Sequence, residues 1–228
     1  SFFINLIASF LFFIIVLSSF NKFSNSTWIG INLASTLNNA LDDPWCLYQV
    51  IYPYDIYEEY KLKYNKVASA MLTNTKLLDQ IAKQKRYTFI STGMSNEKNI
   101  KEAIKIFKKN KCKFMLMHCV SSYPAKDNEL NLNYIKTMKK KFKSDVGYSG
   151  HEISVSPSLI AACLGAQAIE RHITLDRTMW GTDQSASLEL NGMKLLTELV
   201  RKFEECKGNG IKKFNNLEKK MLKKFKYW

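Results

Sequence analysis

The sequence predicts an α/β fold, a TIM (β/α)8 barrel that is incomplete at its N-terminal end and preceded by a hydrophobic helix. From about Tyr64 onward, five short apolar runs alternate with helical patterns, which favours right-handed βαβ units around a parallel sheet. Two histidines, His151 and His172, stand 21 residues apart, each near the end of a predicted strand, with one predicted helix between them. That spacing returns the chain to the same edge of the sheet, where such folds keep their chemistry.

The predicted elements follow one another at regular intervals. Each strand is a short apolar run, and each helix is a longer stretch with its apolar residues on one face. Gly208 and Gly210 follow the last helix and suit a left-handed cap. The predicted strands are 65–70, 87–92, 113–120, 146–149 and 168–173, and the predicted helices are 74–85, 96–109, 131–142, 156–164 and 192–206.

The strand count falls short of a closed barrel, which needs eight strands. Upstream of Tyr64 only one further strand is predicted, at 46–52. We therefore expect residues 64–228 to form a portion of a barrel. Residues 22–63 are expected to hold at most the remnant of an early barrel strand.

The first 21 residues contain no charged side chain, and Lys22 follows directly. About 20 apolar residues can span a bilayer as a helix. Residues 1–21 therefore predict a hydrophobic leader whose plain functional interpretation is a membrane anchor. The alternatives are a buried core helix or a stretch of sequence that does not belong to the natural protein. Without an anchor, we expect a cytoplasmic protein.

Charge and cysteine content set loose limits on function. The net charge is +14, and lysines cluster at 139–143 and 219–226. Nucleic-acid binding would need such clusters on a recognisable module, and we find none, so no nucleic-acid partner is expected. Five irregularly spaced cysteines argue against a disulfide framework and favour a reduced cytoplasm. Cys119 and Cys163 lie in apolar runs and are predicted to be core residues.

Polar groups at the strand ends predict a ligand site. His151 and His172 suit a divalent metal that keeps open positions for substrate, whereas His118 lies inside an apolar strand and is predicted to be packed. In the polar loop 181–189, Asp183 is placed to orient a sugar hydroxyl, and Asp176 with Arg177 would brace the loop. A rim that carries a lysine and several hydroxyls suits phosphate or carboxylate. Its members are Lys66, Ser69, Ser91, Thr92, Ser121, Tyr123 and Ser149.

Six segments occur in the order found in the sialic acid synthase family, and the sequence resembles that family over about residues 64–228. The family comprises N-acetylneuraminate synthase and its legionaminate, pseudaminate and spore-coat-polysaccharide relatives. The segments are KVASAM (66–71), ISTGM (90–94), HCVSSYP (118–124), GYSGHE (147–152), ERHITLD (170–176) and GTDQSASLE (181–189).

The resemblance implies a phosphoenolpyruvate-dependent synthase on a TIM barrel that serves surface carbohydrate biosynthesis. The enol carbon of phosphoenolpyruvate would attack the open-chain aldehyde of an N-acetylated hexosamine such as N-acetylmannosamine. Water then adds and phosphate leaves, which gives a nine-carbon 2-keto sugar acid. The resemblance also implies a homodimer and a metal, Mn²⁺ or Mg²⁺, held by His151 and His172. It assigns Lys66, Ser69, Ser91 and Ser149 to phosphoenolpyruvate, and Ser121, Tyr123 and Asp183 to the sugar.

The sequence departs from the family pattern in three respects. Members usually carry a glutamate in the first strand and a lysine in the second, and we find no equivalent. Met71 stands where some members place a second glutamate. No antifreeze-like domain is expected after the barrel portion, as in the shorter members.

Two alternatives therefore stay open. One is a non-catalytic relative or inactive fragment, membrane-anchored through residues 1–21 or not, that keeps only the binding site. The other is a related aldolase that condenses phosphoenolpyruvate with a sugar phosphate. That aldolase would want an arginine-rich second phosphate site, and only four arginines occur.

Overall fold

A single sheet organises the fold in the computed structural model, which describes residues 11–16, 32–33, 64–181 and 183–226. Its strand order is β2-β1-β7-β6-β5-β4-β3. The five strands from β3 to β7 are parallel to one another, whereas β1 pairs antiparallel with β7 and β2 pairs antiparallel with β1. The strands are β1 (Leu11–Val16), β2 (Asn32–Leu33), β3 (Tyr64–Val67), β4 (Tyr87–Ser91), β5 (Phe114–Cys119), β6 (Val146–Gly150) and β7 (Ala168–Ile173).

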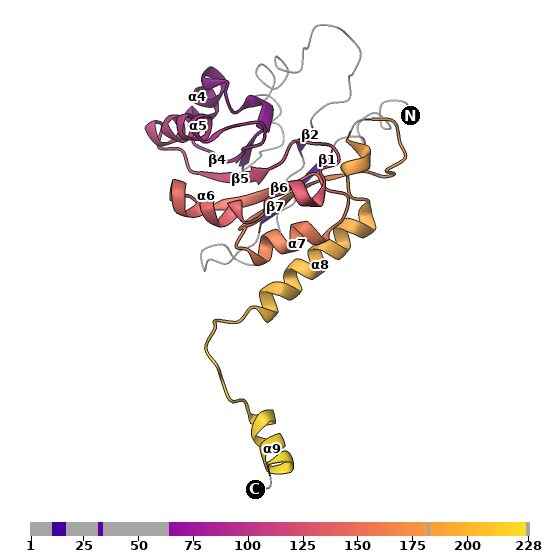
Figure 1. Ribbon diagram of the computed structural model, residues 1–228. Coiled ribbons are helices and arrows are strands. Elements are labelled where there is room, and N and C mark those ends of the chain that lie inside the picture. Colours follow the sequence, from indigo (N-terminus) through magenta and orange to yellow (C-terminus); the bar gives the residue numbers. More distant parts are fainter. Residues whose placement is uncertain (1–10, 17–31, 34–63, 182, 227–228) are drawn as a thin grey trace.

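The helices from α4 to α8 follow the parallel strands in turn and lie along one face of the sheet, whereas α9 lies apart from the sheet near the C-terminus (Figure 1). The predicted order of elements from 64 to 206 is confirmed, with ends that differ by three residues at most. The helices are α4 (Thr75–Lys83), α5 (Glu97–Lys109), α6 (Tyr134–Phe142), α7 (Ser156–Cys163), α8 (Leu190–Cys206) and α9 (Asn216–Phe225), with short 3-10 turns η1 (Ser69–Met71), η2 (Asp127–Glu129) and η3 (Gln184–Ala186).

Asparagine side chains set two of the helix starts. The Asn74 side chain accepts a hydrogen bond from the Leu77 N–H at 3.1 Å, and the Asn96 side chain accepts one from the Asn99 N–H at 3.1 Å. Each bond satisfies a backbone donor that the first helical turn leaves without a partner. The predicted starts at 74 and 96 are therefore the caps of α4 and α5.

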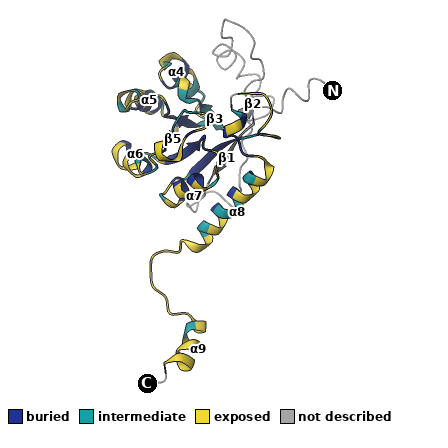
Figure 2. Cartoon of the chain, turned by 45° about the vertical axis from the view of Figure 1, so that its right-hand side comes forward, coloured by how far each residue is buried: buried dark blue, intermediate teal, exposed yellow. Residues whose placement is uncertain are grey.

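The two faces of the sheet carry different cores because side chains alternate along each strand. Residues such as Val67, Ile90 and Leu116 face the helices and join the main hydrophobic core. The opposite, inner face holds a smaller cluster that includes Phe89 and Met117. In Figure 2 the parallel strands are largely buried, and the helices around them expose part of their residues.

The parallel strands form a curled half-barrel. Strands β3 and β7 are separated by three others, which in a flat sheet would put them about 19 Å apart at about 4.8 Å per interval. Yet the Nζ atom of Lys66 in β3 lies 3.2 Å from a carboxylate oxygen of Glu170 in β7. Strong curvature must bring these strand ends together, so the predicted incomplete barrel is confirmed for the described residues.

The predicted leader helix is wrong where the structure describes it. Leu11–Val16 is a strand that runs the full length of β7. Apolar content alone does not separate a strand from a helix, and this stretch is rich in the aromatic and β-branched residues that favour strands. Within the described residues, no helix is long and apolar enough to cross a membrane. The rest of the leader and the predicted strand at 46–52 lie outside the described residues.

Two other differences concern the C-terminal half. Cys163, predicted to be a core residue, is exposed at the end of α7, whereas Cys119 is buried as predicted. Helix α9 was not predicted. It follows Gly208 and Gly210, which adopt the expected left-handed conformation with φ of 57° and 75°, and it buries none of its own residues.

Candidate active site

Polar side chains replace the apolar ones on the inner face toward the carboxyl end of each parallel strand. Along β7, Ala168 belongs to the inner apolar cluster, and Glu170 and His172 follow it on the same face. Backbone pairing places Cys119, Ser149 and Glu170 at one level across β5, β6 and β7. The predicted gathering of polar groups at this edge of the sheet is thus present in the structure.

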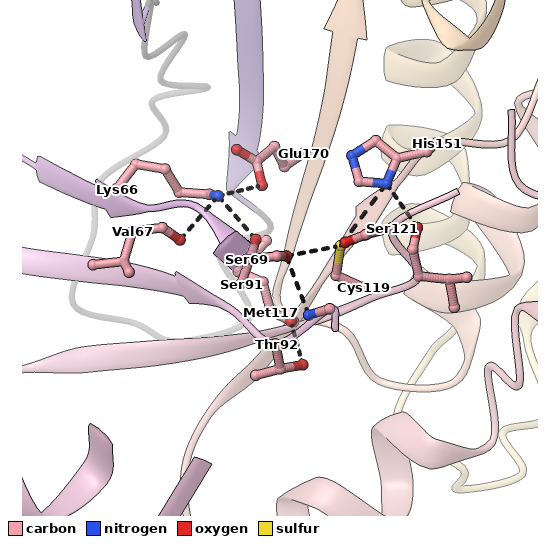
Figure 3. Close-up of polar contacts among 12 residues, drawn as sticks. Lys66, Val67, Ser69, Ser91, Thr92, Met117, Cys119, Ser121, His151 and Glu170 are labelled. Atoms are coloured by element: carbon pink, nitrogen blue, oxygen red, sulfur yellow. Dashed lines mark hydrogen bonds and ion pairs between the residues drawn. The ribbon is translucent and has the colours of Figure 1, made fainter. Parts of the chain in front are cut away.

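Lys66 lies at the centre of one cluster on this rim. Its Nζ donates to the Ser91 Oγ at 2.8 Å and to the Val67 carbonyl at 3.3 Å, and it pairs with Glu170 at 3.2 Å. The Lys66 side chain is 12% exposed, so its charge is largely shielded from water. Figure 3 shows the ammonium group between Ser91 and Glu170. A cation and a hydroxyl held together in this way can bind a phosphate or carboxylate group.

A second cluster joins Ser69, Cys119 and Ser121. The Ser69 Oγ accepts from the Gly93 N–H at 3.1 Å and donates to the Cys119 Sγ at 3.4 Å, while the Ser121 Oγ lies 3.7 Å from the same sulfur. A Cβ on Gly93 would come within 2.1 Å of the Ser121 Oγ. Only glycine therefore allows the two hydroxyls, which follow β3 and β5, to approach the strand end at Gly93 this closely.

His151 and His172 stand side by side, as their spacing predicts. Their ring centroids are 5.1 Å apart, and the Tyr123 ring lies 4.2 Å from that of His151 and 5.7 Å from that of His172. The Nδ1 of His151 is 2.9 Å from the Val120 carbonyl oxygen. Because a carbonyl only accepts hydrogen bonds, Nδ1 carries the proton and Nε2 keeps a lone pair available for a ligand.

The protonation of the two imidazoles follows from their surroundings. Burial, followed by the positive charges of His151 and Lys66, holds the pKa of His172 well below its usual value, so its ring stays neutral. Burial also acts to lower the pKa of His151, but the neighbouring Cys119 and the Val120 carbonyl outweigh it and raise this pKa. Burial opposes ionisation of Cys119 itself, yet contact with His151 lowers the pKa of that thiol to about 7.

The donor set fits one divalent ion. A ligand nitrogen lies about 2.1 Å from such an ion, and two rings 5.1 Å apart can share it. Within the described residues, no three histidine, cysteine, aspartate or glutamate side chains gather as a complete metal site. The two histidines would thus leave coordination positions for substrate and water oxygens, which Mn²⁺ and Mg²⁺ accept.

The neighbours of the two histidines point away from the site and hold it in place. Glu152 and Arg171 form an ion pair at 2.9 Å, with both side chains fully buried. Glu152 also accepts from the Tyr148 hydroxyl at 2.9 Å and from the Ser158 hydroxyl at 2.7 Å. Arg171 donates in addition to the backbone carbonyls of Glu152 and Ser154. This network ties the end of β6 to β7, and therefore fixes His151 relative to His172.

The loop after β7 packs against His172. The Leu188 N–H donates to the His172 carbonyl at 2.9 Å, and a carboxylate oxygen of Asp183 lies 3.8 Å from the His172 Nδ1. As predicted, Asp176 and Arg177 brace this region. Asp176 accepts from the Thr178 N–H at 2.7 Å, and Arg177 donates to the Ser185 carbonyl.

The other polar residues predicted near the strand ends face different partners. Tyr123 is partly exposed, and burial together with the negative charges of Cys119 and Asp183 raises its pKa, so its hydroxyl remains a donor. His118 is packed on the helix side of the sheet, where its Nε2 lies 2.7 Å from the Leu130 carbonyl. Thr92 is turned back onto the Met117 carbonyl at 2.9 Å.

Sequence reasoning assigned no role to two residues of the site. Glu170 lies two positions before His172 on the same face of β7, and this alternation was the signal that could have found it. Gly93 had no such signal, because its role depends on contacts between distant strand ends.

Comparisons with known proteins place these features in a family. The model of the NeuB family matches residues 44–212. N,N'-diacetyllegionaminic acid synthase of Campylobacter jejuni is 42% identical over 171 residues, which are 74% of this chain and 51% of that protein. Human N-acetylneuraminate-9-phosphate synthase is 37% identical over 155 residues, which are 68% of this chain and 43% of that protein.

A solved structure agrees with the sequence comparisons. The N-acetylneuraminic acid synthetase of Leptospira borgpetersenii matches with a TM-score of 0.68 and 31% identity, over 78% of this chain and 62% of that one. The chain spans about half the length of the curated relatives it matches.

Proposed function

This chain belongs to the NeuB family, and on that premise we propose that it carries the active site of a sialic-acid-type synthase. The reaction joins phosphoenolpyruvate to an N-acetylated hexosamine, with N-acetylmannosamine as the simplest candidate. The enol carbon C3 bonds to the sugar aldehyde carbon, water adds at C2, and inorganic phosphate leaves. The product is a nine-carbon 2-keto sugar acid. The names of the relatives support this class of product.

The observation that carries the proposal is the position of Lys66 beside the histidine pair. Its ammonium group is held by Ser91 and largely shielded from water, so it can bind the phosphate of phosphoenolpyruvate with little competition from solvent. Ser69 and Ser149, also buried or partly buried on the rim, would donate hydrogen bonds to the same substrate. These four residues bind and orient the nucleophile.

The sugar would lie on the other side of the rim. Tyr123, which follows β5, lies against the His151 ring, and Asp183, in the loop after β7, lies near His172. Ser121 also follows β5 and lies near the Cys119 sulfur. The Tyr123 hydroxyl donates, and the Asp183 carboxylate accepts from sugar hydroxyls. A metal ion bound to His151 and His172 would polarise the aldehyde carbonyl. The side chains thereby orient the aldehyde carbon toward the enol carbon and keep bulk water from the reacting atoms.

The cellular setting follows from the same premise. We place the reaction in the cytoplasm, in the synthesis of surface carbohydrate, with a homodimer as the working assembly. The second candidate is a relative that binds phosphoenolpyruvate without turnover.

Phosphate release from phosphoenolpyruvate tests the proposal. The assay compares the chain with and without N-acetylmannosamine in the presence of Mn²⁺, alongside His172→Ala and a control, His118→Gln. His118 is a buried histidine outside the site, and glutamine can keep its bond to the Leu130 carbonyl. We expect release that requires the sugar, is lost in His172→Ala and persists in His118→Gln.

The other outcomes separate the candidates. Binding of phosphoenolpyruvate without release would favour the non-catalytic relative. Release with N-acetylmannosamine 6-phosphate and none with the free sugar would move the acceptor to the sugar phosphates. Folded protein that neither binds nor turns over phosphoenolpyruvate would contradict the proposal.

A further inference from the structure

Glu170 is a buried carboxylate that the proposed reaction leaves without a role. Its side chain is 1% exposed, and it lies on the inner face of β7, level with Ser149 of β6. Neither of its oxygens accepts a hydrogen bond from the described residues. It forms an ion pair with Lys66, at 3.2 Å. Figure 3 shows this carboxylate directed at the lysine.

A buried carboxylate with no hydrogen-bond donors depends on its counter-ion. Removing a charge from water is costly, and only a close opposite charge offsets that cost. For Glu170 this charge is Lys66. Lys66 is also the cation proposed to hold the phosphate group of phosphoenolpyruvate. One ammonium group therefore faces two anions in a place largely shielded from water.

The two anions cannot both pair fully with Lys66. Its Nζ donates to the Ser91 hydroxyl and the Val67 carbonyl, and it lies 3.2 Å from the Glu170 carboxylate. A phosphate that arrives at the ammonium group must share its charge with Glu170, and it then lies close to a like charge. The repulsion lowers its affinity, and this effect is strong where water is scarce.

Resting on the proposed function, we propose that Glu170 is the internal counter-ion of Lys66 and competes with the phosphate group for it. The Lys66–Glu170 pair opens when phosphoenolpyruvate binds and closes again as inorganic phosphate leaves. Glu170 is thus a positioning residue that acts through Lys66. It limits the affinity for substrate and product phosphate alike, and this keeps the product from remaining on the lysine.

Titration calorimetry with phosphoenolpyruvate and with inorganic phosphate tests the inference. Glu170→Gln keeps the shape of the side chain and removes its charge. Without the competing anion, we expect both ligands to bind about tenfold more tightly, which corresponds to about 1.4 kcal/mol. In the phosphate-release assay, the same variant should show stronger inhibition by added phosphate. A role limited to packing would not change that inhibition.

Two further variants complete the experiment. Glu189→Gln removes one negative charge from the loop after β7, and it should leave both affinities unchanged because Glu189 is exposed and its side chain accepts a hydrogen bond from the Arg177 backbone N–H, away from Lys66. Glu170→Met fills a similar volume without polarity and should repeat the tightening seen with glutamine.

The outcomes distinguish this inference from the proposed function. Equal or weaker binding of both ligands to folded Glu170→Gln would overturn the competition, as would a failure of both Glu170 variants to fold. A wild-type chain that binds neither phosphoenolpyruvate nor phosphate would instead overturn the proposed function.

Discussion

Replacing Glu152 by glutamine tests whether the buried network behind the histidines holds the site together. Glu152 is fully buried and accepts three hydrogen bonds, from Arg171, Ser158 and Tyr148. Glutamine keeps the shape of the side chain but removes its charge, and its NH₂ group then faces groups that themselves donate hydrogen bonds. Breaking a buried ion pair by removing one partner costs about 3–5 kcal/mol.

The loss should be visible in urea unfolding followed by far-ultraviolet circular dichroism. With a slope of about 2 kcal/mol per molar urea, that cost moves the midpoint down by about 2 M. Glu97→Gln is the matched control, because it removes the same charge from an exposed ion pair with Lys141. Solvent screens that pair, so its midpoint should stay close to the wild type. Equal midpoints for the two variants would refute the reasoning.

Three further predictions concern the rim and its protonation. Gly93→Ala forces a Cβ onto Ser121, so it should lower the free energy of unfolding by about 1–3 kcal/mol and weaken phosphoenolpyruvate binding. Gly192→Ala is the matched control: its Cβ would lie 3.5 Å from the nearest atom, so urea unfolding and calorimetry should show no change. Lys66→Met should lose phosphoenolpyruvate binding but retain Mn²⁺ binding. An unchanged affinity for phosphoenolpyruvate would show that Lys66 does not bind this substrate. Burial lowers the pKa of His118, so the unfolded chain binds the proton more readily, and the stability of the metal-free protein should fall as pH drops below about 6.5. His118→Gln should reduce this fall in stability at low pH, and an unchanged pH dependence would contradict the assignment of part of the fall to His118.

The sequence predicted the arrangement of the half-barrel well because two simple regularities govern it. Alternating apolar runs and helical patterns fix the βαβ units, and parallel units bring every strand end to one edge. The spacing of His151 and His172 was informative for that reason: one βα unit separates them, and neighbouring strands then place them side by side. Local caps such as Asn96 fixed helix starts for equally local reasons.

Features that depend on distant contacts were not predictable in this way. The partnership of Glu170 with Lys66 requires a sheet curled enough to join β3 to β7, and no local pattern encodes that curvature. Gly93 matters because two hydroxyls from other strands crowd it. The strand at Leu11–Val16 was mistaken for part of a helix because its apolar residues suit both, and pairing with the edge of β7 decides between them.

The central claim is that His151 and His172 form one metal site beside the phosphoenolpyruvate rim. Electron paramagnetic resonance of Mn²⁺ tests it most directly, because only free Mn²⁺ gives the strong six-line signal. We expect one bound ion per chain, lost in His151→Ala and in His172→Ala and retained in His118→Gln. Mn²⁺ binding that is unchanged in both alanine variants, or that is absent from the folded wild-type chain, would contradict it.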